Sequence, residues 1–336
     1  MEDLDDIDRQ IVAALVRNSR ASWRRIADVL GQQERTVARR GNRLLGSKTV
    51  RTTGVVNPLA VGADAPFFVT VTAAPREIRS VAAWLAHRPE TVWVASLAGS
   101  NQCVVELFLP PRRLGDFLYN DLSSMEGVQS FVSAPLFEYY RTLSGWKPDI
   151  LNEKQYQILH PDEDAGLASL RVGLRPDSLD ETNLDLARLL RDNGRATADE
   201  LSSKVRISKA TASRRLESMI SSGALFIQAV VDPADLGYGV EALLTITADK
   251  GAGERVGQHL GELSATRWAA ASDHHVLAQV AVADLGAFQT LLNSLSARHD
   301  IQDVQAPMFA EFFKRGSTVI DSHTRAVRPR PTFVGG

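Results

Sequence analysis

Two short segments of the chain carry arginine together with threonine, serine or lysine, a combination that suits contact with nucleic acid. Arginine can donate two hydrogen bonds to a guanine edge, and hydroxyl and ammonium groups donate to phosphate oxygens. In both segments, helical spacing places most of these side chains on the arc opposite the apolar residues, with Arg40 at its flank and Ser208 at the start of the helix. The candidate DNA-binding residues are Arg35, Thr36, Arg39, Arg40 and Arg43 in the first segment and Ser208, Lys209, Thr211, Ser213, Arg214 and Arg215 in the second.

A basic helix face is more often a solvated surface than a DNA contact, so the context of each segment has to decide between the two. The chain of 336 residues has 38 Lys and Arg against 40 Asp and Glu, and a formal net charge of -2. A uniformly basic coat is therefore excluded, and contact with DNA requires a local concentration of charge. Residues 1–54 provide one, with eleven Lys and Arg against seven Asp and Glu.

Nucleophilic and metal-binding chemistry has little support in the sequence. Cys103 is the single cysteine, which excludes an intrachain disulfide and a zinc site of paired cysteines, and no His or Asp partner can be named for it. His274 and His275 are adjacent, and neighbours on a strand point to opposite faces. We therefore expect a protein that is not an enzyme and holds neither metal nor cofactor.

The N-terminal segment and the hydropathy pattern indicate a cytoplasmic protein. The start, MEDLDDIDRQ, is acidic and polar and does not resemble a signal peptide. No apolar run approaches the roughly 20 residues that span a bilayer. Membrane contact is not expected.

The sequence repeats itself at an offset of 175 residues. Leu4 falls on Leu179, and the register holds without gaps until Trp93 falls on Trp268. Later in the copies, with small insertions and deletions, LGDF at 114–117 falls on LGAF at 285–288. Agreement over so many spaced positions indicates a tandem duplication.

Each copy opens with three short amphipathic segments. Their apolar residues recur at helical spacing, and acidic residues near the start of the first segment suit the helix dipole. Ser208 is placed to cap the third helix of the second copy. We predict helices over about 4–17, 23–30 and 34–45, and over about 181–191, 198–205 and 209–221. Three such helices indicate a helix-turn-helix unit in each copy, with the basic segments on the third helix.

The remainder of each copy alternates strand-like and helix-like patterns in the order βαββαβ. In the first copy we predict strands at 65–73, at TVWVASL, at NQCVVELFL and at 128–139, with helices at 76–87 and 114–125. The order is typical of a ferredoxin-like sandwich, whose uncovered sheet face needs a partner. The other copy can supply it within the same chain. Trp93 and Trp268, at equivalent positions, are either core residues or the wall of an effector pocket.

The predicted fold class is α+β, with two copies of a three-helix winged helix-turn-helix followed by a βαββαβ ferredoxin-like sandwich. The predicted domains are a first helix-turn-helix at 1–54, a first sensing domain at 65–141, a linker at 142–178, a second helix-turn-helix at 179–229, a second sensing domain at 240–315, and a basic tail at 316–336.

The openings LDDIDRQIVAALVRNSRAS and LDETNLDLARLLRDNGRAT, followed by βαββαβ, resemble the leucine-responsive regulatory protein family, Lrp/AsnC. The third helix of that family usually looks like G-L-S-x-S-T-V-x-R-R-V. The second copy keeps this pattern, whereas the first copy has Gln33 for the capping serine, Arg35 for the second serine, Gly41 for an apolar residue and Lys48 for the turn glycine. A glycine inside a helix costs about 1 kcal/mol, so the first unit is expected to be the less stable one.

The resemblance implies a transcriptional regulator that binds double-stranded DNA, associates through its sensing domains and responds to an amino acid or a similar small molecule. We expect a homo-oligomer built on a pseudo-dimer within one chain. In the family the effector binds near a turn between the second and third strands, and neither copy keeps the family's aspartate there. The corresponding candidate effector-binding residues are Gly99, Ser100, Asn101 and Gln102 in the first copy and Ser272, Asp273, His274 and His275 in the second.

Three alternatives remain at this point. Siroheme decarboxylases resemble the same scaffold and some are fused pairs, but their His and Arg motifs on the sandwich have no counterpart in this sequence. One copy could also have lost DNA binding and serve in assembly only. The eight turn residues could equally form ordinary hairpin turns, because Gly, Ser, Asn and Asp tolerate turn backbones.

Overall fold

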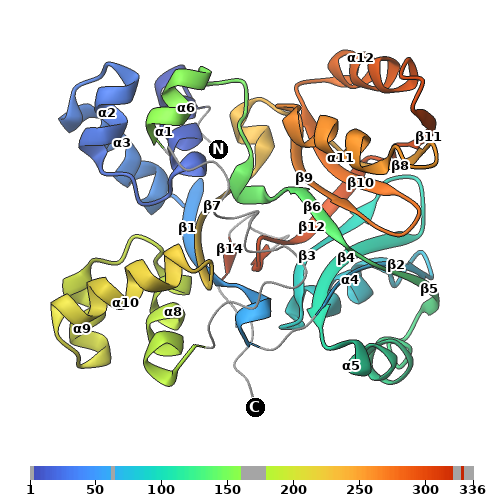
Figure 1. Ribbon diagram of the computed structural model, residues 1–336, viewed down its shortest axis with the longest axis horizontal. Coiled ribbons are helices and arrows are strands. Elements are labelled where there is room, and N and C mark those ends of the chain that lie inside the picture. The colour runs from blue at the N-terminus through green and yellow to red at the C-terminus, as the bar shows by residue number, and fades with distance from the viewer. Residues whose placement is uncertain (1–3, 62–64, 160–178, 321–326, 329–336) are drawn as a thin grey trace.

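The computed structural model describes residues 4–61, 65–159, 179–320 and 327–328. Figure 1 shows the two helical units on one side of the molecule and two β-sheets on the other. Within the described ranges, no helix combines the length and the apolar character needed to cross a membrane.

The predicted three-helix units are confirmed in both copies. Aspartates Asp5 and Asp180 cap the first helix of their units, and each accepts a hydrogen bond from a backbone amide three residues on. Apolar residues from the three helices of each unit pack into one small core. The helices are α1 (Asp6–Arg17), α2 (Trp23–Leu30) and α3 (Glu34–Gly46), and α8 (Glu181–Asp192), α9 (Ala198–Val205) and α10 (Lys209–Ser221).

The strand that follows each third helix pairs with its counterpart from the other unit. β1 (Val50–Val56) and β7 (Leu225–Val231) form a two-stranded antiparallel ribbon, in which Thr53 lies opposite Gln228. These two residues are related by the 175-residue offset, so a pseudo-two-fold axis passes between them. The short segments η1 (Pro58–Val61) and η4 (Pro233–Leu236) follow the two strands.

Two arginines related by the same offset cross this axis reciprocally. Arg20 donates hydrogen bonds to the carbonyl oxygens of Gly194 and Ala196, at 2.6 and 3.1 Å. Arg195 donates to those of Ser19 and Ala21, at 2.7 and 2.9 Å. Burial lowers the pKa of both guanidinium groups. Together with the ribbon, these contacts fix the two helical units relative to each other.

Both sandwiches have the predicted ferredoxin-like topology. The first contains β2 (Ala65–Ala73), α4 (Ile78–His87), β3 (Thr91–Leu97), β4 (Gln102–Leu109), α5 (Pro111–Asp116), the π-helical turn η2 (Phe117–Leu122) and β5 (Val128–Pro135). The second contains β8 (Val240–Ala248), α11 (Gly253–Glu262), β9 (Thr266–Ala271), β10 (Val276–Val282), α12 (Leu285–Ser296) and β11 (Ile301–Gln305). The sheet orders β3-β4-β2-β5 and β9-β10-β8-β11 are equivalent.

The last strand of each sandwich differs from the prediction. Instead of continuing to Tyr139, the first one ends at Pro135, and β6 (Glu138–Arg141) pairs with β9 of the other sheet. Likewise β12 (Phe309–Arg315) leaves β11 and pairs with β3. The predicted domains 65–141 and 240–315 therefore exchange their terminal strands, because each sheet has an open edge beside its second strand.

The predicted linker and tail are also partly folded. Within 142–178, Leu143 of η3 (Leu143–Gly145) packs against the core between the sheets, whereas Trp146 and, from α6 (Glu153–Leu159), Tyr156 and Leu159 contribute buried side chains to the first helical core. Within 316–336, β13 (Thr318–Ile320) extends the sheet beyond β12, and β14 (Val327–Arg328) pairs with β13. Residues 160–178, 321–326 and 329–336 of these segments lie outside the described ranges.

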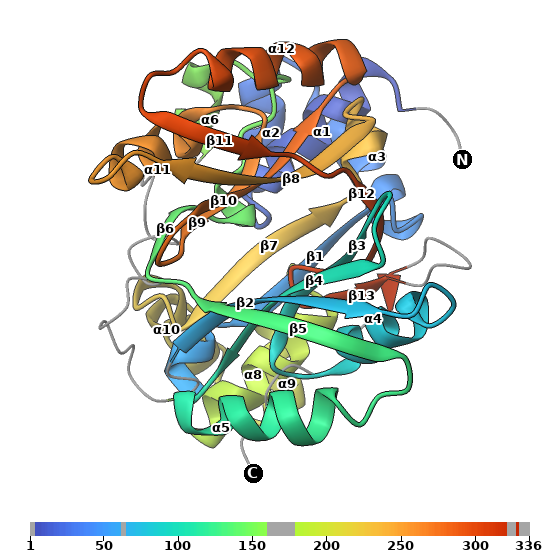
Figure 2. The ribbon, with the colours of Figure 1, turned by 90° about the vertical axis from the view of Figure 1, so that its right-hand side faces the viewer.

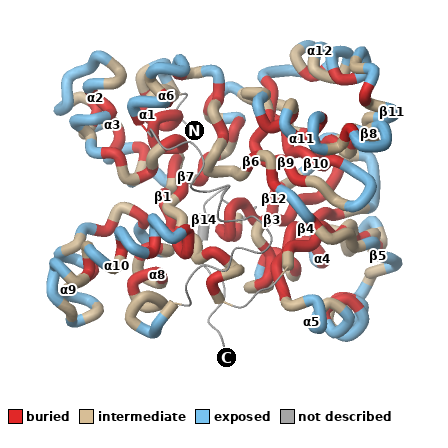
Figure 3. Tube along the Cα trace, in the orientation of Figure 1, coloured by how far each residue is buried: buried red, intermediate tan, exposed pale blue. Residues whose placement is uncertain are grey.

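The two sheets pack face to face within the chain. Figure 2 shows four layers, with α11 and α12 outside the five-stranded sheet and α4 and α5 outside the seven-stranded one. Phe68 and Trp93 from the first copy share a core with Leu243 and Trp268 from the second. Burial is concentrated along the strands where the sheets meet, while the outer helix faces are exposed (Figure 3). The apolar face of each sheet, which the sequence left uncovered, is therefore covered by the other sheet.

Candidate DNA-binding helices and effector turns

The second unit presents its third helix, α10, with an ordered start. Ser208 caps the helix, and its Oγ accepts a hydrogen bond from the backbone amide of Thr211 at 3.1 Å. Lys209 forms an exposed ion pair with Asp199 at 2.8 Å. Ser213 is half-buried, and Arg214 is exposed without a hydrogen-bond or ion-pair partner among the described residues. Arg214 is thus available to an external anion.

The first unit presents α3 in the same way but without a side-chain cap at Gln33. Arg35 and Arg39 are exposed, and neither has a polar partner within the part of the chain that the structure describes. Thr36 is half-buried. Arg39 and Arg214 are related by the 175-residue offset, so each helical unit carries one free arginine at the same place.

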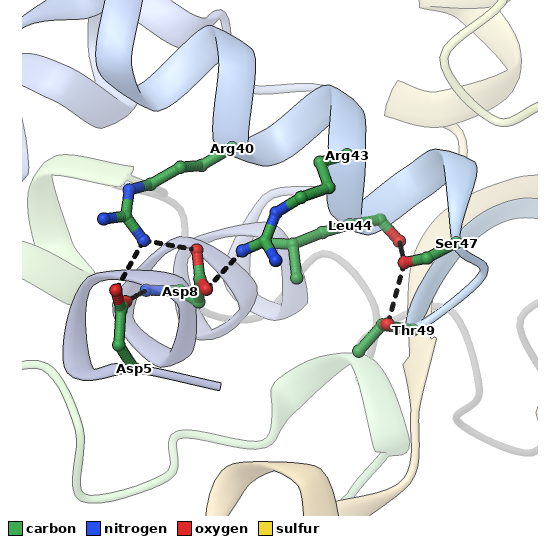
Figure 4. Close-up of polar contacts among 7 residues, drawn as sticks. All are labelled: Asp5, Asp8, Arg40, Arg43, Leu44, Ser47 and Thr49. Carbon is green, nitrogen blue, oxygen red and sulfur yellow. Dashed lines mark hydrogen bonds and ion pairs between the residues drawn. The ribbon is translucent and has the colours of Figure 1, made fainter. Parts of the chain in front are cut away.

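Three other predicted DNA-binding arginines are bound to carboxylates of their own unit. Arg40 contacts Asp5 at 2.6 Å and Asp8 at 3.0 Å, and Arg43 also contacts Asp8 (Figure 4). At the equivalent place, Arg215 contacts Asp180 at 2.6 Å. These pairs join the third helix to the start of the first.

The pKa values of the capping aspartates reflect this arrangement. The hydrogen bond from the Asp8 amide and the contact with Arg40 lower the pKa of Asp5. For Asp180, the Arg215 side chain and the Asn183 amide lower the pKa. The lowered pKa values favour the ionised form of both carboxyl groups, which these ion pairs require.

Gly41, one of the departures of the first copy from the family pattern, is compensated by packing from a neighbouring helix. A Cβ on Gly41 would lie 2.4 Å from the ring of Trp23, so the indole fills the space that the missing side chain leaves. In the second copy the same two positions hold Leu216 and Ala198. Trp23 on the neighbouring helix thus provides the packing that an apolar side chain at position 41 would give, and the lower stability expected for the first unit stays a prediction. Lys48, with φ 62°, occupies the left-handed position of the second copy's Gly223.

The uncapped start of α3 yields a test of local stability. Replacing Gln33 with serine should stabilise the protein by about 1 kcal/mol, because the hydroxyl can accept an orphan amide of the first turn. Ser208→Ala should destabilise it by about the same amount. Urea unfolding measures both, and Gln32→Ser, one residue before the cap, is the control. Equal stability of Gln33→Ser and wild type would contradict the assignment of the cap.

The eight predicted effector residues lie at two separate hairpin tips. Gly99, Ser100, Asn101 and Gln102 join β3 to β4, and Ser272, Asp273, His274 and His275 join β9 to β10. Most of them are exposed. In the second tip, the Ser272 amide donates to the His275 carbonyl at 2.8 Å, and His274 lies 3.3 Å from Asp273. Among the described residues no hydrogen bond or ion pair is recorded between the two tips. Binding of an effector by these turns stays a prediction.

Cys103 is buried, whereas His274 and His275 lie in the turn between β9 and β10 and not, as expected from the sequence, on a strand. Cys103 is buried in the core of the first sandwich, and burial raises the pKa of its thiol to about 12. His274 and His275 are exposed. Within the described ranges there is no group of three His, Cys, Asp or Glu side chains placed to hold a metal ion.

The sequence prediction missed a buried polar cluster between the two sheets. Glu106, in the middle of β4, accepts hydrogen bonds from the Tyr139 hydroxyl at 2.6 Å and from Trp268 Nε1 at 3.3 Å. Trp93 and Trp268 both lie in the core between the sheets, and Trp268 also lines a cavity next to Glu106. A lone glutamate within an apolar strand is the only sequence signal of this cluster.

Known proteins with similar sequences correspond to one copy of the repeat. Residues 4–45 match the AsnC-type helix-turn-helix domain family, and residues 179–225 match a family of winged helix-turn-helix DNA-binding domains. The HTH-type transcriptional regulator FL11 of Pyrococcus furiosus is 32% identical over 128 residues, which cover 38% of this chain and 84% of the relative. A second, uncharacterized HTH-type transcriptional regulator of that organism is 29% identical over 129 residues, covering 38% of this chain and 87% of the relative.

One solved structure shares the tandem architecture. The siroheme decarboxylase NirDL aligns with a TM-score of 0.61 over 93% of both chains at 12% identity, a likeness that concerns the fold alone. Helical units and sandwiches together define a tandem helix-turn-helix protein with two fused ferredoxin-like domains. The chain belongs to the Lrp/AsnC family of transcriptional regulators, in a duplicated form.

Proposed function

We propose that the chain is a sequence-specific regulator that contacts double-stranded DNA through α3 and α10 at once. The observation that carries the proposal is the pair Arg39 and Arg214, which are exposed and unpaired at equivalent positions while their neighbours Arg40 and Arg215 are bound to aspartates. An arginine on the third helix of such a unit can reach guanine edges or phosphates in the major groove.

The two units are joined rigidly enough to read two half-sites together. The ribbon of β1 and β7 and the reciprocal arginines Arg20 and Arg195 connect them across the pseudo-two-fold axis. The reading faces are unequal, because Arg35 of the first unit corresponds to Ala210 of the second. We therefore expect an operator with two different half-sites about one helical turn apart.

Sensing and assembly are further parts of the proposal. A small polar effector, such as an amino acid, would bind at the hairpin tips 99–102 and 272–275, where backbone groups and polar side chains are exposed. Association of whole chains would use exposed apolar residues such as Val132 on the edge strand β5, Leu285 at the start of α12 and Met308 between β11 and β12. A homo-oligomer in which two chains are related by a two-fold axis would bind a palindromic operator, although each chain alone contacts two different half-sites.

Selection of bound genomic fragments by the purified chain tests the proposal. We expect enrichment of a common sequence and an affinity that falls steeply with salt, since each phosphate contact releases about one counterion. The double variant Arg39→Ala with Arg214→Ala should lose the enrichment, while Arg112→Ala with Arg113→Ala, two exposed arginines on α5, should keep it.

Two results would contradict the proposal. One is equal enrichment by both double variants, which would place the contact with DNA elsewhere. The other is a chain that binds no DNA but gives a Soret band with siroheme, which would favour the decarboxylase function of its structural neighbour NirDL.

A further inference from the structure

A cavity of about 80 Å³ lies where the two sheets meet the ribbon that carries the helical units. Its walls are mainly apolar and aromatic, and they come from both copies of the repeat. Phe108 and Tyr139 belong to the first copy, Phe226 and Trp268 to the second, and Leu143 to the segment between them. An engineered apolar cavity of about 150 Å³ binds benzene, so this one suits a smaller molecule and not a tetrapyrrole.

One carboxyl group reaches this cavity from the buried side. Glu106 is among the lining residues, and its side chain is almost fully buried. The hydrogen bonds from Tyr139 and Trp268 both end on Oε1. Neither Tyr139 nor Trp268 carries a positive charge at neutral pH, so these neighbours leave an ionised Glu106 without a counter-charge.

The lining decides which ligand chemistry fits. Its other polar side chains are neutral ones, Thr142, Ser144 and Gln228, and the lining contains no Lys, Arg or His. A buried carboxylate is stabilised by a cation that donates hydrogen bonds, whereas a second carboxylate would meet only repulsion. The cavity therefore suits a protonated amine on a small apolar body and disfavours the zwitterion of an amino acid.

We propose that this cavity is a binding site for one small aliphatic monoamine per chain, held by Glu106. The site is single because the pseudo-symmetric position carries no acid. Glu106 lies opposite Trp93 in the first sheet, and Gln279 lies opposite Trp268 in the second. This site is separate from the hairpin tips at 99–102 and 272–275.

The position of the cavity connects a bound amine to the DNA-reading units. Val55 of β1 and Phe226 and Gln228 of β7 line it, and Gln228 lies at the pseudo-two-fold axis of the ribbon. Gln228 also donates a hydrogen bond to the carbonyl of Gly316, which follows β12. A bound amine would contact both sheets and the β1–β7 ribbon, so we expect it to change the position of the two helical units relative to the sheets. This second step rests on the proposed function in DNA binding.

Calorimetry with isobutylamine tests the site itself. Isobutylamine should bind with one site per chain, whereas isobutanol, isobutyrate and valine, which is isobutylamine with an added carboxylate, should bind at least about tenfold more weakly. Glu106→Gln keeps the shape and the hydrogen-bond acceptor and should lose the amine preference. Glu138→Gln, an exposed glutamate on β6, is the matched control and should bind as wild type does. Equal binding of valine and isobutylamine, or unchanged binding by Glu106→Gln, would overturn the assignment.

The pH dependence gives an independent readout. Burial raises the pKa of Glu106 to about 7, although the hydrogen bonds from Tyr139 and Trp268 oppose the rise. The titratable group in contact with Glu106 is Tyr139, whose own pKa is raised by burial and by Glu106. The amine needs the ionised carboxylate, so its affinity should fall about tenfold from pH 8 to pH 6. A flat profile would contradict a contact with Glu106.

DNA binding separates the two parts of the inference. Saturating isobutylamine should change the DNA dissociation constant of the wild type about fivefold or more, and that of Glu106→Gln hardly at all. Unchanged DNA affinity with the amine bound would refute the connection through the ribbon and leave the site intact. A chain that binds the amine but no DNA would refute the proposed function instead.

Discussion

Replacing Glu241 with alanine is expected to lower the free energy of unfolding by about 3–5 kcal/mol. Glu241, on β8, accepts hydrogen bonds from Arg267 at 2.8 Å and from Arg315 at 2.5 Å, and all three side chains are nearly buried. Its removal leaves two buried guanidinium groups facing each other without a negative charge. Because Arg315 comes from the exchanged strand β12, the loss also weakens the contact between the two sheets. Urea unfolding measures the effect.

The same cluster makes the free energy of unfolding depend on pH in the acid range. Burial by itself raises the pKa of Glu241, but Arg315 and Arg267 outweigh it, so the pKa is lowered from its ordinary value of 4.5. A lowered pKa contributes stability above the unfolded value, and that contribution is lost as the pH falls below about 4.5. Glu241→Ala should therefore lose less stability than wild type on acidification. Glu138→Ala is the exposed control, and a loss as small as the control's at neutral pH would refute the role of the cluster.

Alanine at Arg214 and alanine at Arg215 are expected to act on different properties. Arg214→Ala should weaken DNA binding about 10–100-fold if the side chain reads a base, and should reduce the salt slope by about 1 if it contacts a phosphate. Its unfolding free energy should stay unchanged, because Arg214 is exposed and has no partner among the described residues. Arg215→Ala removes the ion pair with Asp180 and should cost at most about 1 kcal/mol of stability.

Arg39→Ala and Arg40→Ala repeat this comparison in the first unit and serve as its internal control. Fluorescence anisotropy with a selected operator measures affinity and salt slope, and urea unfolding measures stability. If Arg215→Ala weakens DNA binding as much as Arg214→Ala while the fold keeps its stability, the division between reading and positioning arginines is wrong.

The repeat and the helical periodicity allowed most of the fold to be predicted from the sequence. Amphipathic spacing depends on neighbours along the chain, so α3, α10 and the βαββαβ order were predictable. The exchange of β6 and β12 was not, because the residues after Pro135 and Pro307 have the pattern of a strand whichever sheet they join. The partner of each strand depends on the tertiary structure, in which two sheet edges are open. The alternation of apolar and polar residues within one strand does not identify which edge it joins.

The candidate site was also predictable only where it depends on residues close in the sequence. Helical spacing identified the outward arc of α3, but it could not separate Arg39 from Arg40, because Asp5 approaches from another helix. The packing of Trp23 against Gly41 could not be predicted, because it joins two helices. Glu106 was missed because its partners Tyr139 and Trp268 come from an exchanged strand and from the other copy.

The exchanged strand β12 matters for how the protein is made on the ribosome. The first sheet leaves its β3 edge open until residues 309–315 have been synthesised, long after β2 to β5 are complete. At about 5–20 residues per second, the wait lasts roughly ten seconds or more. An unpaired edge can pair with another nascent chain on the same messenger RNA. During this interval the unpaired β3 edge is therefore a place where the incomplete chain can aggregate.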